Sequence, residues 1–180
     1  MEDTIKDGDT RMKKEIGWAE PEYVVSQPRI QKVDGFHYFY LEKKDVSEAG
    51  VGDHILSMIA EAFKSIAESN AKAGEVPPLL VMFIDMPNKP RYYDMQVGFS
   101  VSPDVKPVGE ANVRYVKPAL SSSALAWGDI NMVPKTYGIT IDFAKEKGFD
   151  GAGEWREWYL YWERDVSKNN VTLVQWMLKE

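Results

Sequence analysis

The sequence contains no cysteine. This absence excludes disulfides, thiol catalysis and cysteine-ligated metal sites, and it is compatible with a cytoplasmic protein. Long apolar runs are also missing: the longest one, residues 79–84, is far too short to span a bilayer. Residues 1–15 are too polar to serve as a secretory signal. We therefore expect a cytoplasmic protein that does not enter the membrane.

Basic residues are scarce. The 22 Lys and Arg are outnumbered by 28 Asp and Glu, which gives a net charge of −6. Nucleic-acid phosphates require a basic face, so we expect no nucleic-acid partner. The two histidines, His37 and His54, do not have the spacing of metal ligands, and the sequence has no glycine-rich phosphate loop or dinucleotide fingerprint. The sequence thus predicts neither a metal nor a cofactor.

Aromatic residues, in contrast, are abundant. The chain has 6 Trp, 9 Tyr and 7 Phe, together with 8 Met, and such residues line adaptable ligand pockets. Five of the ten residues in 154–163 are aromatic, which is typical of a β-strand. Strict alternation along this strand predicts two faces. One face is expected to carry Glu157, Tyr159, Tyr161 and Glu163, and the other Arg156, Trp158, Leu160 and Trp162.

Hydrophobic periodicity predicts the same order of elements twice. The apolar residues of 51–66 recur at helical spacing, as do those of 134–147, and each stretch lies between segments with strand signals. The predicted strands are 23–41, 79–86 and 91–101 in the first half, and 111–127, 154–163 and 171–178 in the second. The sequence therefore predicts an α+β fold of two pseudo-symmetric strand-helix-strand-strand halves with joined antiparallel sheets and a central ligand pocket. We expect a flexible tail at 1–20 and a single small-molecule-binding domain at 21–180, with halves at about 21–105 and 106–180.

Two stretches resemble a known family. Residues 93–101 read Tyr-Asp-Met-Gln-Val-Gly-Phe-Ser-Val, which is similar to the Asp-x-Glu-x-Gly-x-Pro strand of the GyrI-like, or bacterial effector-binding, domains. Residues 156–160 read Arg-Glu-Trp-Tyr-Leu, which is similar to the Glu-x-Tyr strand that follows the second helix in that family. The doubled order of elements matches the family's tandem halves. The sequence departs from the first motif at Gln96, where the family has an acidic residue.

The resemblance implies an aromatic pocket between the two halves. In the family a buried glutamate in this pocket commonly meets planar cations, and the matching residue is Glu157. Some members are effector domains of bacterial transcription regulators behind a helix-turn-helix, some are free-standing multidrug binders, and one branch hydrolyses cyclopropane toxins. The residues before Tyr23 are too few for a helix-turn-helix.

The predicted ligand-binding residues come from several strands. They are Glu157, Tyr159, Tyr161, Trp127, Trp158, Asp94, Gln96 and Tyr38. Structural alternatives stay open for each kind of residue. Glu157 would instead pair with a cross-strand Lys or Arg, Asp94 would bond to backbone near the sheet edge, and the aromatics would be ordinary core.

The leading functional hypothesis is a stand-alone binder of small, hydrophobic or aromatic, often cationic ligands. The alternative is a hydrolase in which Glu157 activates water and Tyr159 donates a proton to the leaving group, although a non-enzymatic role is preferred. A weaker alternative is a protein-interaction module of the topoisomerase-inhibitor type. The sequence is compatible with a monomer or a homodimer.

Overall fold

A computed structural model describes residues 23–71 and 78–180 of the chain. The tail expected at residues 1–20 and most of the loop expected at 71–78 lie outside these ranges. None of the helices within the described ranges is both long enough and apolar enough to cross a membrane.

Both predicted helices are present. Helix α2 (Val51–Glu68) follows a short 3-10 turn, η1 (Glu48–Gly50), and the Ser47 side chain caps that turn by accepting a hydrogen bond from the Gly50 amide. Helix α3 (Val133–Glu146) follows a second 3-10 turn, η2 (Ile130–Met132), which is capped by Asp129. A glycine just beyond α3, Gly148, has a φ of +82°, which suits a residue without Cβ at a helix end.

In the part of the chain that the structure describes, nine strands form one antiparallel sheet, and its order is β1-β7-β9-β8-β4-β5-β3-β6, with β2 also paired to β7. The strands are β1 (Tyr23–Val25), β2 (Arg29–Val33), β3 (Phe36–Ser47), β4 (Leu79–Asp85), β5 (Tyr92–Val101), β6 (Asn112–Val116), β7 (Ala119–Gly128), β8 (Gly151–Tyr161) and β9 (Val171–Leu178).

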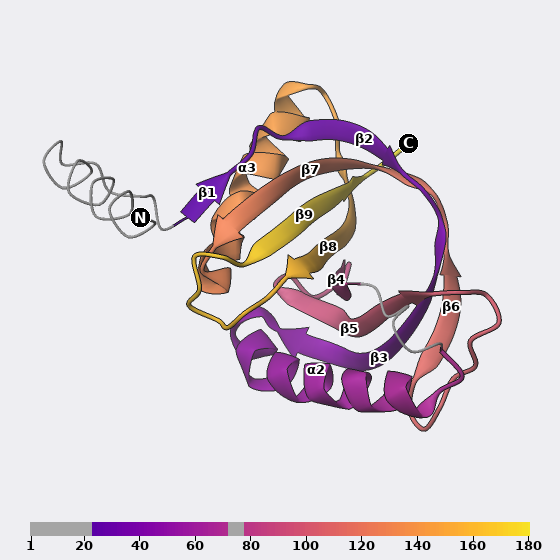
Figure 1. The fold of residues 1–180 in the computed structure, drawn as a ribbon. Helices are drawn as coiled ribbons and strands as arrows, with labels where there is room; N and C mark the ends of the chain where they lie inside the picture. Colours follow the sequence, from indigo (N-terminus) through magenta and orange to yellow (C-terminus); the bar gives the residue numbers. More distant parts are fainter. Residues whose placement is uncertain (1–22, 72–77) are drawn as a thin grey trace, which may run out of the picture.

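The predicted duplication is confirmed by the order of these strands. One half is β3-α2-β4-β5 and the other is β7-α3-β8-β9, and the halves meet where β4 pairs antiparallel with β8. Each half also contributes a strand that pairs with the other half. Strand β2 directly precedes β3 of the first half in the chain but pairs with β7 of the second half. Strand β6 directly precedes β7 but pairs with β3. These exchanged strands bring the two ends of the sheet toward each other, so that the sheet curls (Figure 1).

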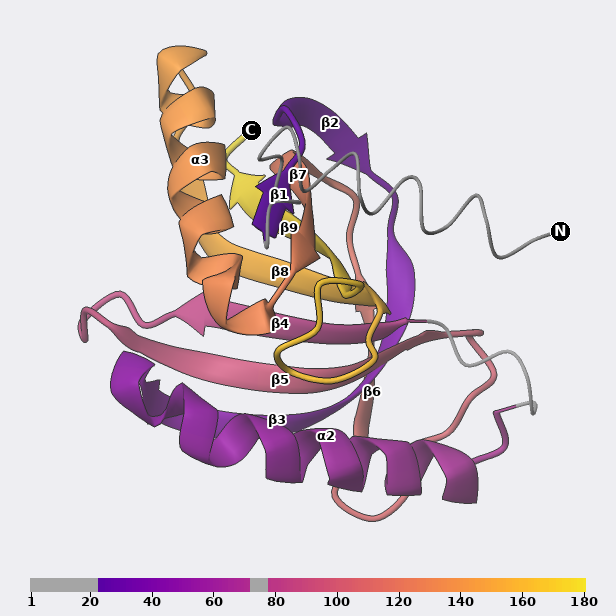
Figure 2. The same cartoon turned by 60° about the vertical axis from the view of Figure 1, so that its left-hand side comes forward.

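The two faces of the curled sheet have different partners. Helix α2 packs on β3 and β5, and α3 packs on β7 and β9, both on the same side of the sheet, which we call the helix face (Figure 2). Its largest core cluster includes Phe39, Val81, Val97 and Phe99. On the opposite side, which we call the inner face, no helix of the described residues packs. Tyr38, Leu80 and Met82 are nevertheless fully buried there because the sheet curls around them.

Candidate functional site

Glu157 lies at the middle of the molecule, on the helix face of β8. It stands opposite Val81 of β4 and Val174 of β9, so it is next to the seam between the two halves. Its side chain is only 7% exposed. A carboxylate enclosed by valines needs hydrogen-bond donors, because burial removes its water. The donors determine what this group can do.

Two tyrosines supply these donors. The Tyr137 hydroxyl of α3 donates to Oε1 of Glu157, and the Tyr159 hydroxyl of β8 donates to Oε2 over 2.5 Å. Burial raises the pKa of Glu157, and the two hydrogen bonds oppose this rise. Burial also raises the pKa of both phenols well above the ordinary value, and the Glu157 charge adds to this, so both stay protonated donors.

The carboxylate of Glu157 thus has two phenols as hydrogen-bond donors. Within residues 23–71 and 78–180, no Lys or Arg forms an ion pair with Glu157. The structure therefore does not show the alternative in which a cross-strand Lys or Arg pairs with Glu157.

An aromatic pocket of about 420 Å³ opens beside Glu157. It lies between the start of α2, the helix α3 and the strands β4, β5 and β8. We call it the aromatic pocket, and its lining includes Glu48, Phe83, Tyr93, Tyr137, Gly138, Trp155 and Glu157. The rings meet edge to face: Phe83 lies 5.9 Å from Tyr93, and Tyr137 lies 4.9 Å from Trp155, between ring centroids. Such rings offer both faces and edges to a flat or cationic ligand.

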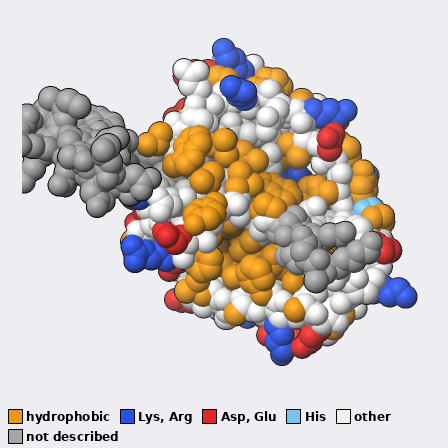
Figure 3. Space-filling model, in the orientation of Figure 1, with side chains coloured by type: hydrophobic (Ala, Val, Ile, Leu, Met, Phe, Trp, Pro, Cys, Tyr) orange, Lys and Arg blue, Asp and Glu red, His pale blue; other side chains and the backbone are white. Residues whose placement is uncertain are grey.

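A second cavity of about 500 Å³ lies on the other side of Tyr159. We call it the apolar groove, and it is lined chiefly by Ile55, Leu56, Ile59, Phe63, Leu79, Tyr159, Leu160 and Trp162. Among the described residues, Asp165 is the one charged residue in its lining. Apolar side chains gather across the middle of the face shown in Figure 3, above α2. Because Tyr159 lines the groove and bonds to Glu157 in the pocket, the two cavities are adjacent along β8.

The strict alternation expected along residues 154–163 is wrong at its end. The register between β8 and β9 shifts between Tyr159, which is opposite Thr172, and Tyr161, which is opposite Val171. The shift inserts Leu160 as an extra residue, as in a β-bulge. Leu160 and Trp162 consequently line the apolar groove, whereas Tyr161 leaves the row of Glu157 and is 54% exposed.

Three other predicted residues lie on the inner face, on the opposite side of the sheet from Glu157. Tyr38 donates to the Leu80 carbonyl over 2.8 Å, and the indole of Trp158 donates to Gln175 over 2.9 Å. Gln96 is held by Arg114 and Glu42. These three side chains are separated from the aromatic pocket by the sheet itself.

The last two predicted residues lie away from both cavities. Asp94 accepts a hydrogen bond from the Asp45 amide over 3.1 Å, the backbone role that the sequence had left open. Trp127 stands opposite Val24 and Val171 on β7 and is 37% exposed. Neither contributes to the lining of the pocket or of the groove described above.

Sequence reasoning missed several residues of the aromatic pocket: Glu48, Phe83, Tyr93, Tyr137 and Trp155. Tyr137 had a readable signal, since it is a hydroxyl-bearing residue on the apolar stripe of its helix and such a hydroxyl needs a polar partner in the core. Phe83 and Tyr93 had none, because their strands had to be paired before they could be assigned to one face.

The fold is shared with solved structures. No protein-family model matches the sequence, and no curated protein matches it. The C-terminal domain of EcmrR superposes with a TM-score of 0.68 at 12% identity, over 86% of this chain and 98% of that domain. The chain spans 65% of the whole EcmrR chain in its complex with DNA.

Two further structures are similar. SAV2435, solved with tetraphenylphosphonium bound, has a TM-score of 0.64 at 11% identity, over 86% of this chain and 94% of that one. A hydrolase encoded by lin2189 from Listeria innocua has a TM-score of 0.54 at 12% identity, over 94% and 98%. The chain therefore has the fold of the GyrI-like effector-binding domains, which confirms the predicted resemblance at the level of the fold.

Proposed function

We propose that the chain binds hydrophobic organic cations with aromatic rings, planar ones among them, in the aromatic pocket, with Glu157 as the counter-charge. The observation that carries this proposal is the buried carboxylate of Glu157, which has phenol donors on both oxygens, aromatic walls beside it and no basic partner among the described residues. A bound cation would regain for Glu157 the favourable charge interactions that burial removes. Faces of Trp and Tyr would add cation–π attraction of about 0.5–2 kcal/mol each. SAV2435, which shares the fold, binds tetraphenylphosphonium, a tetrahedral cation with four phenyl rings, and this supports the cationic and aromatic character of the proposed ligand.

The apolar groove extends the proposed site. A ligand whose charged end meets Glu157 can reach past Tyr159 with an apolar end, because the two cavities are adjacent there. Both cavities fall within the size range of small-molecule sites. We therefore expect selectivity for molecules with one compact cationic end and one apolar end.

Filling the pocket tests this proposal directly. Gly138 lines the aromatic pocket from α3, and a Cβ built on it would meet nothing within 4 Å. We expect Gly138→Leu to weaken the binding of tetraphenylphosphonium by at least about tenfold, or about 1.4 kcal/mol. The measurement is quenching of tryptophan fluorescence, to which Trp155 in the pocket wall contributes.

The matched control is Gly52→Leu on α2. This glycine is exposed, a Cβ there also meets nothing within 4 Å, and it lines neither cavity. Both substitutions replace a helical glycine by a better helix former, so neither is expected to destabilise the fold. Absence of saturable binding by the wild-type protein, or equal binding by Gly138→Leu, would contradict the proposed ligand class or its location.

The alternative of hydrolysis is favoured by the pairing of Glu157 with Tyr159. The raised pKa of Glu157 makes it a better base, and the Tyr159 hydroxyl on Oε2 is a proton source beside it. Glu157 would take a proton from water as the water attacks an electrophilic carbon, and Tyr159 would protonate the leaving group. The shared fold of the Listeria innocua hydrolase supports testing this reaction class.

An aromatic compound with an electrophilic cyclopropane is the probe for this alternative. If the chain is a hydrolase, mass spectrometry will detect the ring-opened water adduct at a rate that falls by about 10²–10⁴-fold in Tyr159→Phe. Binding of the probe without any water adduct would leave the chain as a binder.

A further inference from the structure

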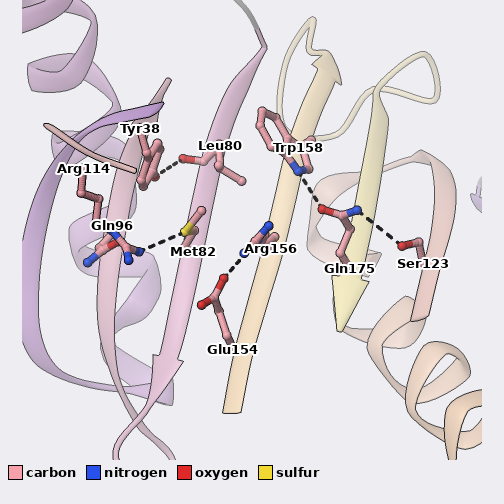
Figure 4. Close-up of polar contacts among 10 residues, drawn as sticks. All are labelled: Tyr38, Leu80, Met82, Gln96, Arg114, Ser123, Glu154, Arg156, Trp158 and Gln175. Carbon is pink, nitrogen blue, oxygen red and sulfur yellow. Dashed lines mark hydrogen bonds and ion pairs between the residues drawn. The ribbon is translucent and has the colours of Figure 1, made fainter. Parts of the chain in front are cut away.

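The inner face of the curled sheet holds two arginines that the aromatic pocket does not use. Arg156 extends from β8 and Arg114 from β6, and both lie on the same face of the sheet near Met82 and Tyr38 (Figure 4). We call these two residues the arginine pair. Arg156 is buried and Arg114 is half-buried, and arginine side chains are rarely buried unless they are paired.

Arg156 is only 2% exposed. Its Nε donates to Oε1 of Glu154 over 2.6 Å, and its Nη1 is buried without any hydrogen-bond partner. Buried guanidinium groups normally satisfy all of their N–H donors. The guanidinium carbon of Arg156 lies 5.6 Å from the centroid of the Phe36 ring, and Nη1 has no hydrogen-bond acceptor among the described residues, so one donor remains for a further group.

Arg114 repeats this pattern. Its Nη2 donates to Oε1 of Gln96 over 2.8 Å and lies 3.6 Å from Sδ of Met82, while its Nε is buried without a partner. Gln96 is neutral, so it does not balance the charge. The nearest acidic group in this network, Glu42, accepts from the other end of the Gln96 amide over 2.8 Å and pairs with Lys44 at 3.5 Å.

The two guanidinium groups lie around the same side chains. Gln96, Met82 and Arg156 are directly opposite one another on β5, β4 and β8, so Met82 stands between the Arg114 contact and Arg156. Burial raises the pKa of Tyr38, and both Arg114 and Arg156 oppose this rise. Both positive charges are thus close enough to act on one hydroxyl.

We propose that a small oxyanion, of the carboxylate or phosphate class, binds on the inner face at the arginine pair, beside the Met82 side chain that separates Arg114 from Arg156. Among the described residues, one carboxylate, Glu154, pairs directly with either of the two guanidinium groups, so the arginine pair carries an excess positive charge, with Arg156 buried and Arg114 half-buried. The planar N–H forks of arginine match the oxygens of carboxylates and phosphates. The two free donors, Nε of Arg114 and Nη1 of Arg156, are the contacts that such an anion would make. This site is separate from the aromatic pocket, from which the sheet divides it.

Titration calorimetry with sodium phosphate and with sodium acetate, in a zwitterionic buffer, tests the proposal on the intact chain. We expect saturable binding by the wild-type protein and at least tenfold weaker binding by Arg114→Gln. Arg91→Gln is the matched control, because Arg91 is an exposed arginine that pairs with Glu48 outside the cluster. Glu157→Gln should bind the anion as the wild-type protein does. Whichever anion binds more tightly assigns the site to phosphates or to carboxylates.

Two results would overturn the proposal. One is the absence of saturable binding of either anion, and the other is equal binding by the wild-type protein and Arg114→Gln. Either result would leave water as the partner of these donors. Near-ultraviolet circular dichroism shows whether each variant is folded. If Arg114→Gln does not fold, Arg114→Lys replaces it, since it keeps the charge and loses the fork. A folded Arg114→Lys should bind several-fold more weakly, and wild-type affinity in that variant would also contradict the site.

Discussion

Replacing Glu157 by Gln is expected to weaken the binding of tetraphenylphosphonium at pH 8 by about 10- to 1,000-fold. The range corresponds to the shift of about 1–3 pKa units that an opposite charge causes at close range. The substitution keeps the shape of the side chain and one carbonyl acceptor for the phenols of Tyr137 and Tyr159. The affinity that is lost is therefore mainly the charge interaction.

The charge interaction of Glu157 should also appear in the pH dependence of wild-type binding. Burial raises the pKa of Glu157 in the free protein, and a bound cation lowers it because it favours the carboxylate. Affinity for the cation should therefore increase with pH between the bound and the free pKa, and be constant above the free value. Glu157→Gln should show no such increase. Fluorescence titrations at a series of pH values measure both curves.

A ligand-free measurement checks the pKa itself. The folded-state pKa of Glu157 is raised, so in the window between the unfolded and the folded value the folded protein holds more protons than the unfolded chain. The wild-type free energy of unfolding must then fall, relative to that of Glu157→Gln, as the pH rises through this window. Glu61→Gln, an exposed change on α2, is the control and should follow the wild type. In the fluorescence titrations described above, a wild-type affinity for tetraphenylphosphonium that does not change with pH would contradict Glu157 as the counter-charge.

The sequence predicted the topology well because its signals were local. The helix around residues 51–66 and the strand at 79–84 are each marked by their own periodicity, and the duplicated order of elements then fixes how the halves join. The exchange of β2 and β6 between the halves was not predictable, because the pairing of an edge strand depends on where distant segments lie.

The candidate site was predicted at its centre and missed at its walls. Glu157 and Tyr159 were placed together by simple alternation, and the structure brings both to one face. Tyr38 and Trp158 are aromatic residues of predicted strands, and Gln96 stands where the family that the sequence resembles has an acidic residue. Their face depends on the pairing register, which a single sequence does not reveal, and the shift after Tyr159 moved Tyr161 in the same way.

Gly98 shows how the structure gives a physical reason for a motif residue. It is the glycine of the Asp-x-Glu-x-Gly-like strand and lies opposite Tyr40 of β3 and Leu80 of β4. A Cβ at this position would lie 1.9 Å from the Phe39 carbonyl oxygen and 2.7 Å from Cα of Tyr40. Both atoms are backbone, so no side-chain rotation relieves the overlap. This chain requires glycine at position 98 because β3 and β5 approach too closely there for any side chain.

Gly98→Ala is therefore expected to lower the free energy of unfolding by about 3 kcal/mol, the upper end of the usual cost of overpacking. Urea denaturation followed by circular dichroism measures this as a lower midpoint. Gly52→Ala is the matched control, since the same methyl group there meets nothing within 4 Å and replaces a helical glycine, and it should stabilise the protein by about 1 kcal/mol. Opposite signs for one chemical change would show that the backbone contact between β3 and β5, and not the propensity of glycine, determines the residue at position 98. Because β5 also carries Tyr93 of the aromatic pocket, a Gly98→Ala protein that does fold should bind tetraphenylphosphonium more weakly than Gly52→Ala does.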